Sequence, residues 1–204
     1  MKLLWVLMLV GSALAADGPR LFYSKSFPGS VPPYAEIILT RAGDVEYREA
    51  PGEDNPIKFK LKDTETEEVF GLVEKAGSLK HSLEAPLKVA FMGTKTFRYE
   101  NGSEKDEVKF NYTQDTSAQA LNDWFERMAE SAQRRIDLER AVKYDKLGVV
   151  KSLLLMEVAL DKKRLVAPEQ FLPLLDRVAN NESYMHTAQS RAADIAAAIR
   201  NPKP

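Results

Sequence analysis

The chain contains no cysteine among its 204 residues, and it has only two histidines. Without thiols it forms no disulfide, thiolate metal site, cysteine nucleophile or cysteine-linked lipid anchor. Two histidines are too few for a histidine-rich metal site, and we expect neither a metal nor another cofactor. The stability of the fold must therefore come from the packing of apolar side chains.

An excess of either charge is also missing, since 29 Lys and Arg residues balance 30 Asp and Glu residues for a net charge of −1. Without a basic excess we expect no nucleic-acid partner. The glycines are isolated, so no Gly-x-Gly-x-x-Gly loop cradles a phosphate. The motifs Gly-x-Ser-x-Gly, Ser-x-x-Lys with Lys-Thr-Gly, and His-Glu-x-x-His are all missing, which removes the common signatures of exported hydrolases.

Apolar runs are short except at the N-terminus. Lys2 precedes the apolar run Leu3–Val10, and the small residues that follow include the pattern Ala13-x-Ala15. This run is shorter than the ~20 residues of a membrane-spanning helix. The sequence therefore predicts a signal peptide over residues 1–15 and a protein exported to the periplasm or the medium, without a membrane anchor.

Residues 16–33 are rich in Pro, Gly and Ser and predict an irregular lead-in. An α+β domain is expected over residues 34–130. The sequence predicts a hairpin formed by Tyr34–Thr40 and Val45–Glu49, with one face exposed to solvent. Apolar and charged residues alternate again in Ile57–Leu61. Thr64-x-x-Glu67 is a capping box that opens a helix, and Gly77 stands where a helix commonly ends. Residues 78–93 are expected to be mostly irregular.

A second hairpin and helix complete this domain. Asn101-Gly102 separates the alternating runs Thr94–Tyr99 and Glu107–Tyr112, and Thr116-x-x-Gln119 is again a capping box. The next helix carries an apolar stripe that we assign to the core: Leu121, Trp124, Phe125 and Met128. The order ββαββα predicts an α+β fold in which two helices cover one face of an antiparallel sheet in two layers.

Residues 131–200 predict an all-helical C-terminal bundle, with residues 201–204 as a tail. The second helix of the α+β domain is expected to leave the sheet and enter this region. The next helix, from about Leu147, is apolar on more than one side and should lie in the middle of the bundle. The triplet Lys162–Arg164 is interpreted as its C-terminal cap. Two further helices are expected, over Leu172–Ala179 and roughly Glu182–Arg200.

Several short stretches of the sequence are similar to stretches in other proteins. Gly43–Tyr47, Glu67–Gly77 and Asn101-Gly102 resemble a ββαββα domain of unknown function in bacterial exported proteins. Over the full length, Lys95–Glu100 and Glu169–Val178 look like phrases in a group of uncharacterised bacterial exported proteins. The resemblance implies a bacterial origin and the two-part layout, and it brings no activity and no functional residues.

The missing motifs favour a non-catalytic binding or protein-interaction module of the periplasm, whose partner is another exported protein or a peptide. Weak candidates for the binding surface are Tyr47, Arg98 and Tyr99, on the exposed faces of the strands. Two alternatives stay open: an envelope hydrolase with two carboxylates, and an inhibitor of a secreted enzyme. His81 and His186 are interpreted as surface or interhelical histidines, and Glu49, Glu53 and Asp54 as a solvent-exposed turn.

Overall fold

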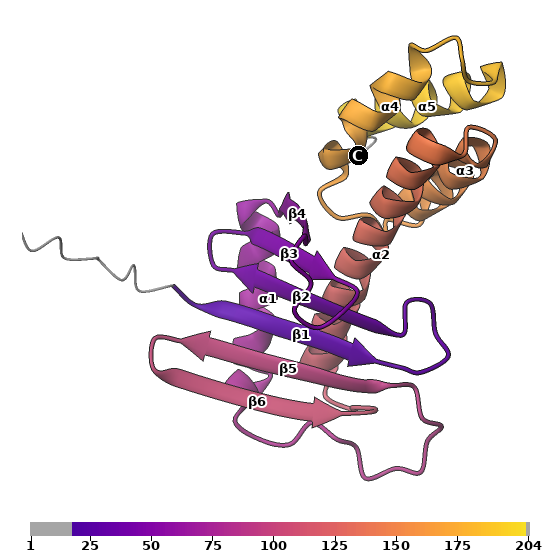
Figure 1. Ribbon diagram of the computed structural model, residues 1–204. Coiled ribbons are helices and arrows are strands. Elements are labelled where there is room, and N and C mark those ends of the chain that lie inside the picture. Colours follow the sequence, from indigo (N-terminus) through magenta and orange to yellow (C-terminus); the bar gives the residue numbers. More distant parts are fainter. Residues whose placement is uncertain (1–17, 203–204) are drawn as a thin grey trace, which may run out of the picture.

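The computed structural model describes residues 18–202 (Figure 1), so the signal peptide predicted for residues 1–15 lies outside the described residues. The strands are β1 (Arg20–Ser26), β2 (Tyr34–Thr40), β3 (Asp44–Arg48), β4 (Ile57–Lys60), β5 (Thr94–Asn101) and β6 (Glu104–Phe110). The α-helices are α1 (Asp63–Lys75), α2 (Thr116–Tyr144), α3 (Gly148–Asp161), α4 (Leu172–Ala179) and α5 (His186–Arg200). None of the helices within residues 18–202 has both the length and the apolar character needed to cross a membrane.

All the strands form one antiparallel sheet in the order β4-β3-β2-β1-β5-β6 (Figure 1). β1 lies inside the sheet, between β2 and β5, so the prediction of an irregular lead-in over residues 16–33 is wrong for Arg20–Ser26. The alternation of this strand is hard to see in the sequence. Apolar Phe22 lies on the open face of the sheet, whereas Lys25 follows Leu21 and Tyr23 on the face covered by helices.

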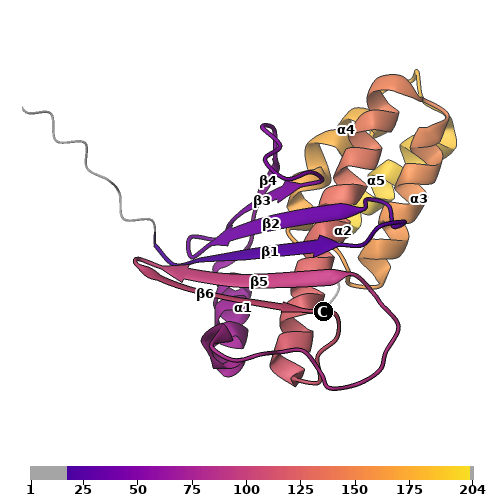
Figure 2. The same cartoon turned by 60° about the horizontal axis from the view of Figure 1, so that its bottom comes forward.

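Helices α1 and α2 lie on the same face of the sheet (Figure 2), as the two-layer prediction requires. Every second strand residue points to this face, because successive side chains of a strand alternate between its two sides, and most of these residues are buried. Tyr23 stacks on Phe125 of α2 with ring centroids 4.7 Å apart, and Phe97 lies 5.7 Å from the same ring. Trp124 and Phe125 are both buried, which confirms that the aromatic stripe of α2 is core.

Helix α1 begins slightly earlier than the sequence predicts. The carboxylate of Glu65 accepts a hydrogen bond of 2.9 Å from the backbone N–H of Lys62, which precedes the first helical residue. The capping box predicted at Thr64 and Glu67 is therefore misplaced by two residues. The predicted end is confirmed: Gly77 follows the helix with a φ of 67°, a conformation that glycine adopts at little cost.

Helix α2 is capped by Asp115, whose carboxylate accepts a hydrogen bond of 2.8 Å from the N–H of Ala118. Thr116 is the first helical residue, and the side chain of Gln119 donates back to the carbonyl of Thr113, so the predicted capping box is wrong in detail. The prediction of one long helix that leaves the sheet is confirmed, because α2 continues without a break to Tyr144. It belongs to both hydrophobic cores of the molecule.

The second core lies between the end of α2 and the three C-terminal helices. Its fully buried side chains come from every helix of this region: Leu138, Leu153, Phe171, Leu175 and Ile195. The helix predicted over Leu172–Ala179 is confirmed. The last helix begins at His186, four residues later than predicted, after a turn in which the Tyr184 N–H donates to Asn181.

The two apolar stripes of helix α3 predict a position in the middle of the bundle. This prediction is wrong. The stripe that contains Val149, Leu153 and Met156 is buried against α2 and α5. The other stripe faces outward, with Leu147 76% and Leu154 45% exposed. The helices that follow cover one side of α3 only, so hydrophobicity on both sides does not place this helix at a centre.

Candidate functional site

The three residues proposed for the binding surface do not share one surface. Tyr47 is 1% exposed on the helix-covered face, where its hydroxyl accepts a hydrogen bond of 2.7 Å from Gln133 of α2. Tyr99 also points to this face and packs at the edge of the first core, against Phe70. Only Arg98 lies on the open face. The expectation that all three are on exposed strand faces is therefore wrong for the two tyrosines.

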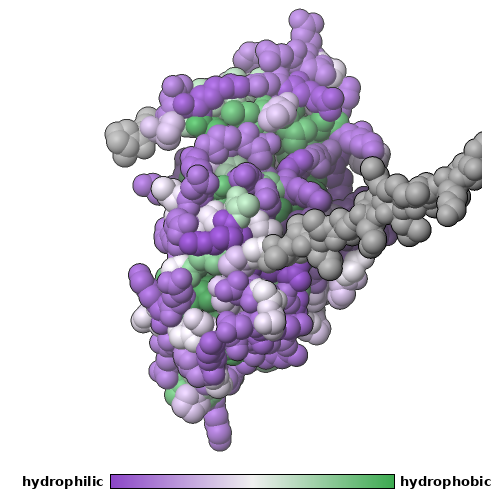
Figure 3. All heavy atoms as spheres, turned by 90° about the vertical axis from the view of Figure 1, so that its left-hand side faces the viewer, coloured by the Kyte–Doolittle hydropathy of each residue, from purple (hydrophilic) through white to green (hydrophobic). Residues whose placement is uncertain are grey.

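The open face of the sheet carries a network of ion pairs. Arg98 lies over the Phe22 ring at 3.9 Å and pairs with Glu100 at 2.8 Å. Near the other edge, Arg48 pairs with Glu46 at 2.6 Å. Hydrophilic residues also predominate on the side of the molecule shown in Figure 3, with hydrophobic residues in smaller areas between them. The cations and carboxylates of the open face pair with one another.

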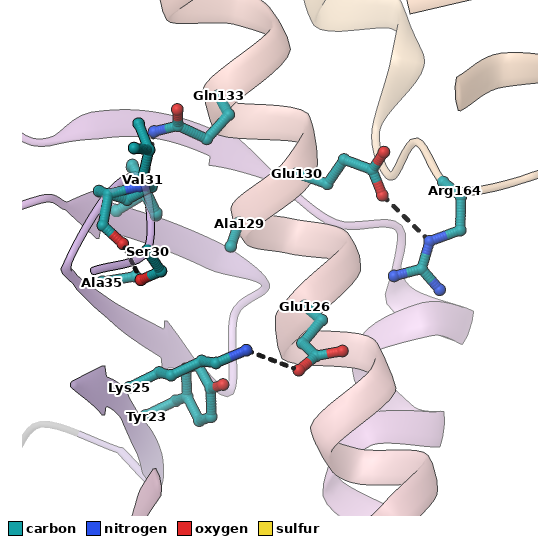
Figure 4. A pocket seen from close by; sticks show the side chains of 12 residues that line it. Tyr23, Lys25, Ser30, Val31, Ala35, Glu126, Ala129, Glu130, Gln133 and Arg164 are labelled. Carbon is teal, nitrogen blue, oxygen red and sulfur yellow. Dashed lines mark hydrogen bonds and ion pairs between the residues drawn. The ribbon is translucent and has the colours of Figure 1, made fainter. Parts of the chain in front are cut away.

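A better candidate is a groove between α2 and the ends of β1, β2 and β5, which we call the α2 groove. It consists of two adjoining cavities of about 310 and 330 Å³ that share Lys25 and Glu126. Side chains of the first include Tyr23, Val31, Ala35, Ala129, Glu130 and Arg164 (Figure 4). Side chains of the second include Met92, Lys95, Phe110, Asn111 and Asn122.

The pairing of the strands explains how two lysines reach this groove. Lys25 is directly opposite Lys95 in the register of β1 and β5, and both follow the alternation that points Tyr23 and Phe97 toward α2. Side chains directly opposite one another on antiparallel strands have Cβ atoms roughly 5 Å apart, and like charges in such a pair destabilise the sheet. Glu126 of α2 lies 3.2 Å from the Lys25 ammonium (Figure 4). Glu126 therefore pairs directly with one of the two lysines.

Lys95 is the more buried of the two, at 6% exposure. Its ammonium donates a hydrogen bond of 2.8 Å to the carbonyl of Asn111 and lies 5.8 Å from the centre of the Phe110 ring. Burial, followed by the charge of Lys25, lowers the pKa of Lys95, while Glu126 acts in the opposite direction. Among the described residues no carboxylate lies within ion-pair distance of Lys95, so a buried charge in a cavity is left without a direct counterion.

The wall of the first cavity is the turn between β1 and β2. The Ser30 hydroxyl lies 2.7 Å from the carbonyl of Phe27 and 2.6 Å from that of Pro32, and the Phe27 N–H donates to Pro33. These bonds hold the turn in a compact shape while Val31 at its tip is 96% exposed. The turn therefore forms one edge of the groove, and its hydrogen bonds fix the shape of that edge.

Arg164 joins the α3–α4 connection to the opposite side of this cavity. Its guanidinium pairs with Glu130 of α2 at 3.1 Å (Figure 4). It also pairs with Asp123 of α2 at 2.5 Å. Arg164 therefore does more than cap α3, which corrects the interpretation of the triplet Lys162–Arg164. Both acidic side chains that line the groove, Glu126 and Glu130, accept from a cation.

Apolar side chains gather beside the mouth of the groove. The Phe27 and Phe91 rings meet edge to face with centroids 5.9 Å apart. Phe91 is 56% and Met92 41% exposed, and Met92 also lines the second cavity. Apolar side chains therefore lie beside the charged residues of the second cavity.

The other polar residues named from the sequence lie outside the α2 groove. Glu53 accepts a hydrogen bond of 2.9 Å from the N–H of Glu49, which closes the turn that follows β3. His81 and His186 are exposed, as predicted. Within residues 18–202 there is no group of three His, Asp or Glu side chains placed to hold a metal ion.

One lysine of the groove could have been noticed in the sequence. Lys95 alternates in phase with Phe97 and Tyr99, which places a lysine on the core side of a predicted strand. Lys25 could not, because its strand was not predicted. Comparison with protein-family models and with curated proteins found no match for this chain. The resemblance to bacterial exported proteins therefore stays a prediction.

Proposed function

We propose that this protein is a non-catalytic binding module of the compartment to which its signal peptide directs it, and that the α2 groove holds the ligand. The observation that carries the proposal is the pair of adjoining cavities, about 310 and 330 Å³, around a buried lysine without a direct counterion. Binding pockets of small molecules have this size and this mixture of apolar walls and a few charged groups.

The groove is a poor match to a hydrolase with two carboxylates. Such an enzyme needs one carboxylic acid that donates a proton and one carboxylate that is free to act as a base or nucleophile. Glu126 and Glu130 are the acidic residues that line the groove, and they pair with Lys25 and Arg164 respectively. Both are therefore committed to holding the two sides of the groove together, which favours binding over hydrolysis.

The test is to purify the protein under native conditions and to identify by mass spectrometry the small molecules that come with it. Ala129 lies on the wall of the first cavity (Figure 4), so Ala129→Trp should fill the cavity and exclude a ligand. Ala42→Trp places the same side chain at an exposed turn and is the matched control. Circular dichroism should show both variants folded.

We expect a compound that is enriched with the wild type and with Ala42→Trp but absent from Ala129→Trp. Identical profiles for the three folded proteins would contradict a ligand in the groove.

A further inference from the structure

The charged side chains that line the α2 groove are three cations, Lys25, Lys95 and Arg164, and two anions, Glu126 and Glu130. Lys25 and Lys95 lie directly opposite each other on β1 and β5, and Glu126 contacts Lys25 alone. Glu84, the other acidic residue that influences Lys95, is engaged by the N–H of Asn111 at 2.5 Å. A buried charge is costly unless an opposite charge accompanies it, so the site favours the arrival of an anion.

The Lys95 ammonium also has donors to spare. It carries three N–H groups, of which one is used by the Asn111 carbonyl. The Phe110 ring occupies another side without accepting a conventional hydrogen bond. An anionic oxygen in the second cavity would accept a hydrogen bond from a Lys95 N–H group that the Asn111 carbonyl does not use.

The groove also offers apolar surface beside its charged groups. Met92 and Phe110 line the second cavity, and Val31, Ala35 and Ala129 line the first. Strands β1, β2 and β5 are paired on both sides, so they offer no free edge to a peptide backbone. An apolar chain that enters beside the lysines can pack against these side chains.

We propose that the α2 groove binds a small monocarboxylic acid with an apolar chain, whose carboxylate lies between Lys25 and Lys95. This inference rests on the proposed function and specifies the ligand class. Glu126 acts as the internal counterion in the empty groove and competes with the carboxylate for Lys25. The apolar chain lies against the side chains that line the two cavities, such as Met92 and Ala129.

The test is a titration of the protein with sodium octanoate, octanol and octylamine, followed by calorimetry and by amide NMR shifts. We expect saturable binding of octanoate with shifts along the groove, binding of octanol at least about tenfold weaker, and none of octylamine. Lys95→Met should weaken octanoate about tenfold, since a hydrogen bond to a charged group is lost. Glu126→Gln should strengthen it, because the competing carboxylate is removed.

Lys105→Met is the matched control, since Lys105 is exposed on the open face and pairs with Glu100. It should leave octanoate affinity unchanged. If Lys95→Met does not fold, Lys25→Met serves in its place. Absence of saturable octanoate binding, or unchanged affinity in the folded lysine variants, would overturn the inference. Octanol binding as tightly as octanoate would overturn the carboxylate assignment, yet shifts along the groove would still support the proposed function.

Discussion

Lys25 and Lys95 face each other across β1 and β5, on the side of the sheet that the helices cover. Opposed like charges weaken a strand pair, and here a single carboxylate, that of Glu126, lies within ion-pair distance of one of them. The arrangement reduces the stability of the empty protein. Because the pKa of Lys95 is lowered in the folded protein, the free energy of unfolding should also depend on pH.

The first prediction concerns this titration. Burial and Lys25 lower the pKa of Lys95, against the opposing influence of Glu126 and Glu84. Between this lowered pKa and the unfolded value of about 10.4, the folded protein binds fewer protons than the unfolded chain. The free energy of unfolding should therefore rise with pH over this interval. Urea unfolding at several pH values should show this rise in the wild type and lose it in Lys95→Met; equal slopes would contradict the argument.

A second prediction concerns more alkaline solutions. Burial raises the pKa of Tyr23 and Tyr47, and it raises the pKa of Tyr34 to about 12. Above about pH 10 the unfolded chain loses these protons while the folded protein keeps them, so stability should fall as pH rises. Tyr23→Phe should reduce this fall in unfolding experiments. Tyr144→Phe, at a tyrosine that is 74% exposed, should leave it unchanged.

The third prediction tests the aromatic core. Phe125 is fully buried and stacks on Tyr23, so Phe125→Ala should lower the free energy of unfolding by about 3–5 kcal/mol. Phe91 is the matched control, because it is 56% exposed on a loop. Phe91→Ala should change stability by less than about 0.5 kcal/mol. Similar losses in the two variants would contradict the burial assigned to Phe125.

A fourth prediction separates the two stripes of α3. Leu153 is fully buried and Leu154 is 45% exposed, although they are neighbours in the sequence. Leu153→Lys should unfold the C-terminal helices, because it places an unpaired charge in their core. Leu154→Lys should leave the melting temperature nearly unchanged. A melting curve and circular dichroism spectrum for each variant decide the matter, and a stable Leu153→Lys would refute the orientation of α3.

The fifth prediction concerns the connection between the two parts of the molecule. Arg164→Met removes the ion pairs with Asp123 and Glu130 and should cost about 1 kcal/mol of stability, since these pairs are partly exposed. Lys162→Met, two residues earlier, should cost nothing measurable. High salt should reduce the difference between the variants. A loss that persists in high salt would point to packing of the Arg164 stem instead.

Local periodicity predicted most of the elements after residue 33, including the helix Leu172–Ala179 and the long helix through Phe125. Alternation within a strand and spacing within a helix depend on nearby residues, which is why they can be read directly. The features that were predicted wrongly depend on residues that are distant in the chain. β1 breaks the simple pattern because Phe22 is outside and Lys25 inside, and the outer stripe of α3 depends on how many helices pack against it.

The candidate site could not be predicted from local sequence patterns, because it also depends on residues that are distant in the chain. The α2 groove exists because β1 pairs with β5 and because α2 crosses the ends of both strands. No pattern within either strand states which residue will be opposite Lys25. Lys95 alone gave a readable signal, as a lysine in phase with Phe97, and that signal becomes informative only when its neighbour is known.

The position of β1 also has a consequence for the order of folding. Of the strands that the structure describes, β1 is synthesised first, yet it joins the two halves of the sheet. Its residue Leu21 pairs with Tyr99 of β5, which is far away in the chain. A growing chain can form β1 to β4 early, but one edge of β1 must wait for β5. Sheets with such distant partners fold slowly, and the waiting edge is a site for mispairing with another chain.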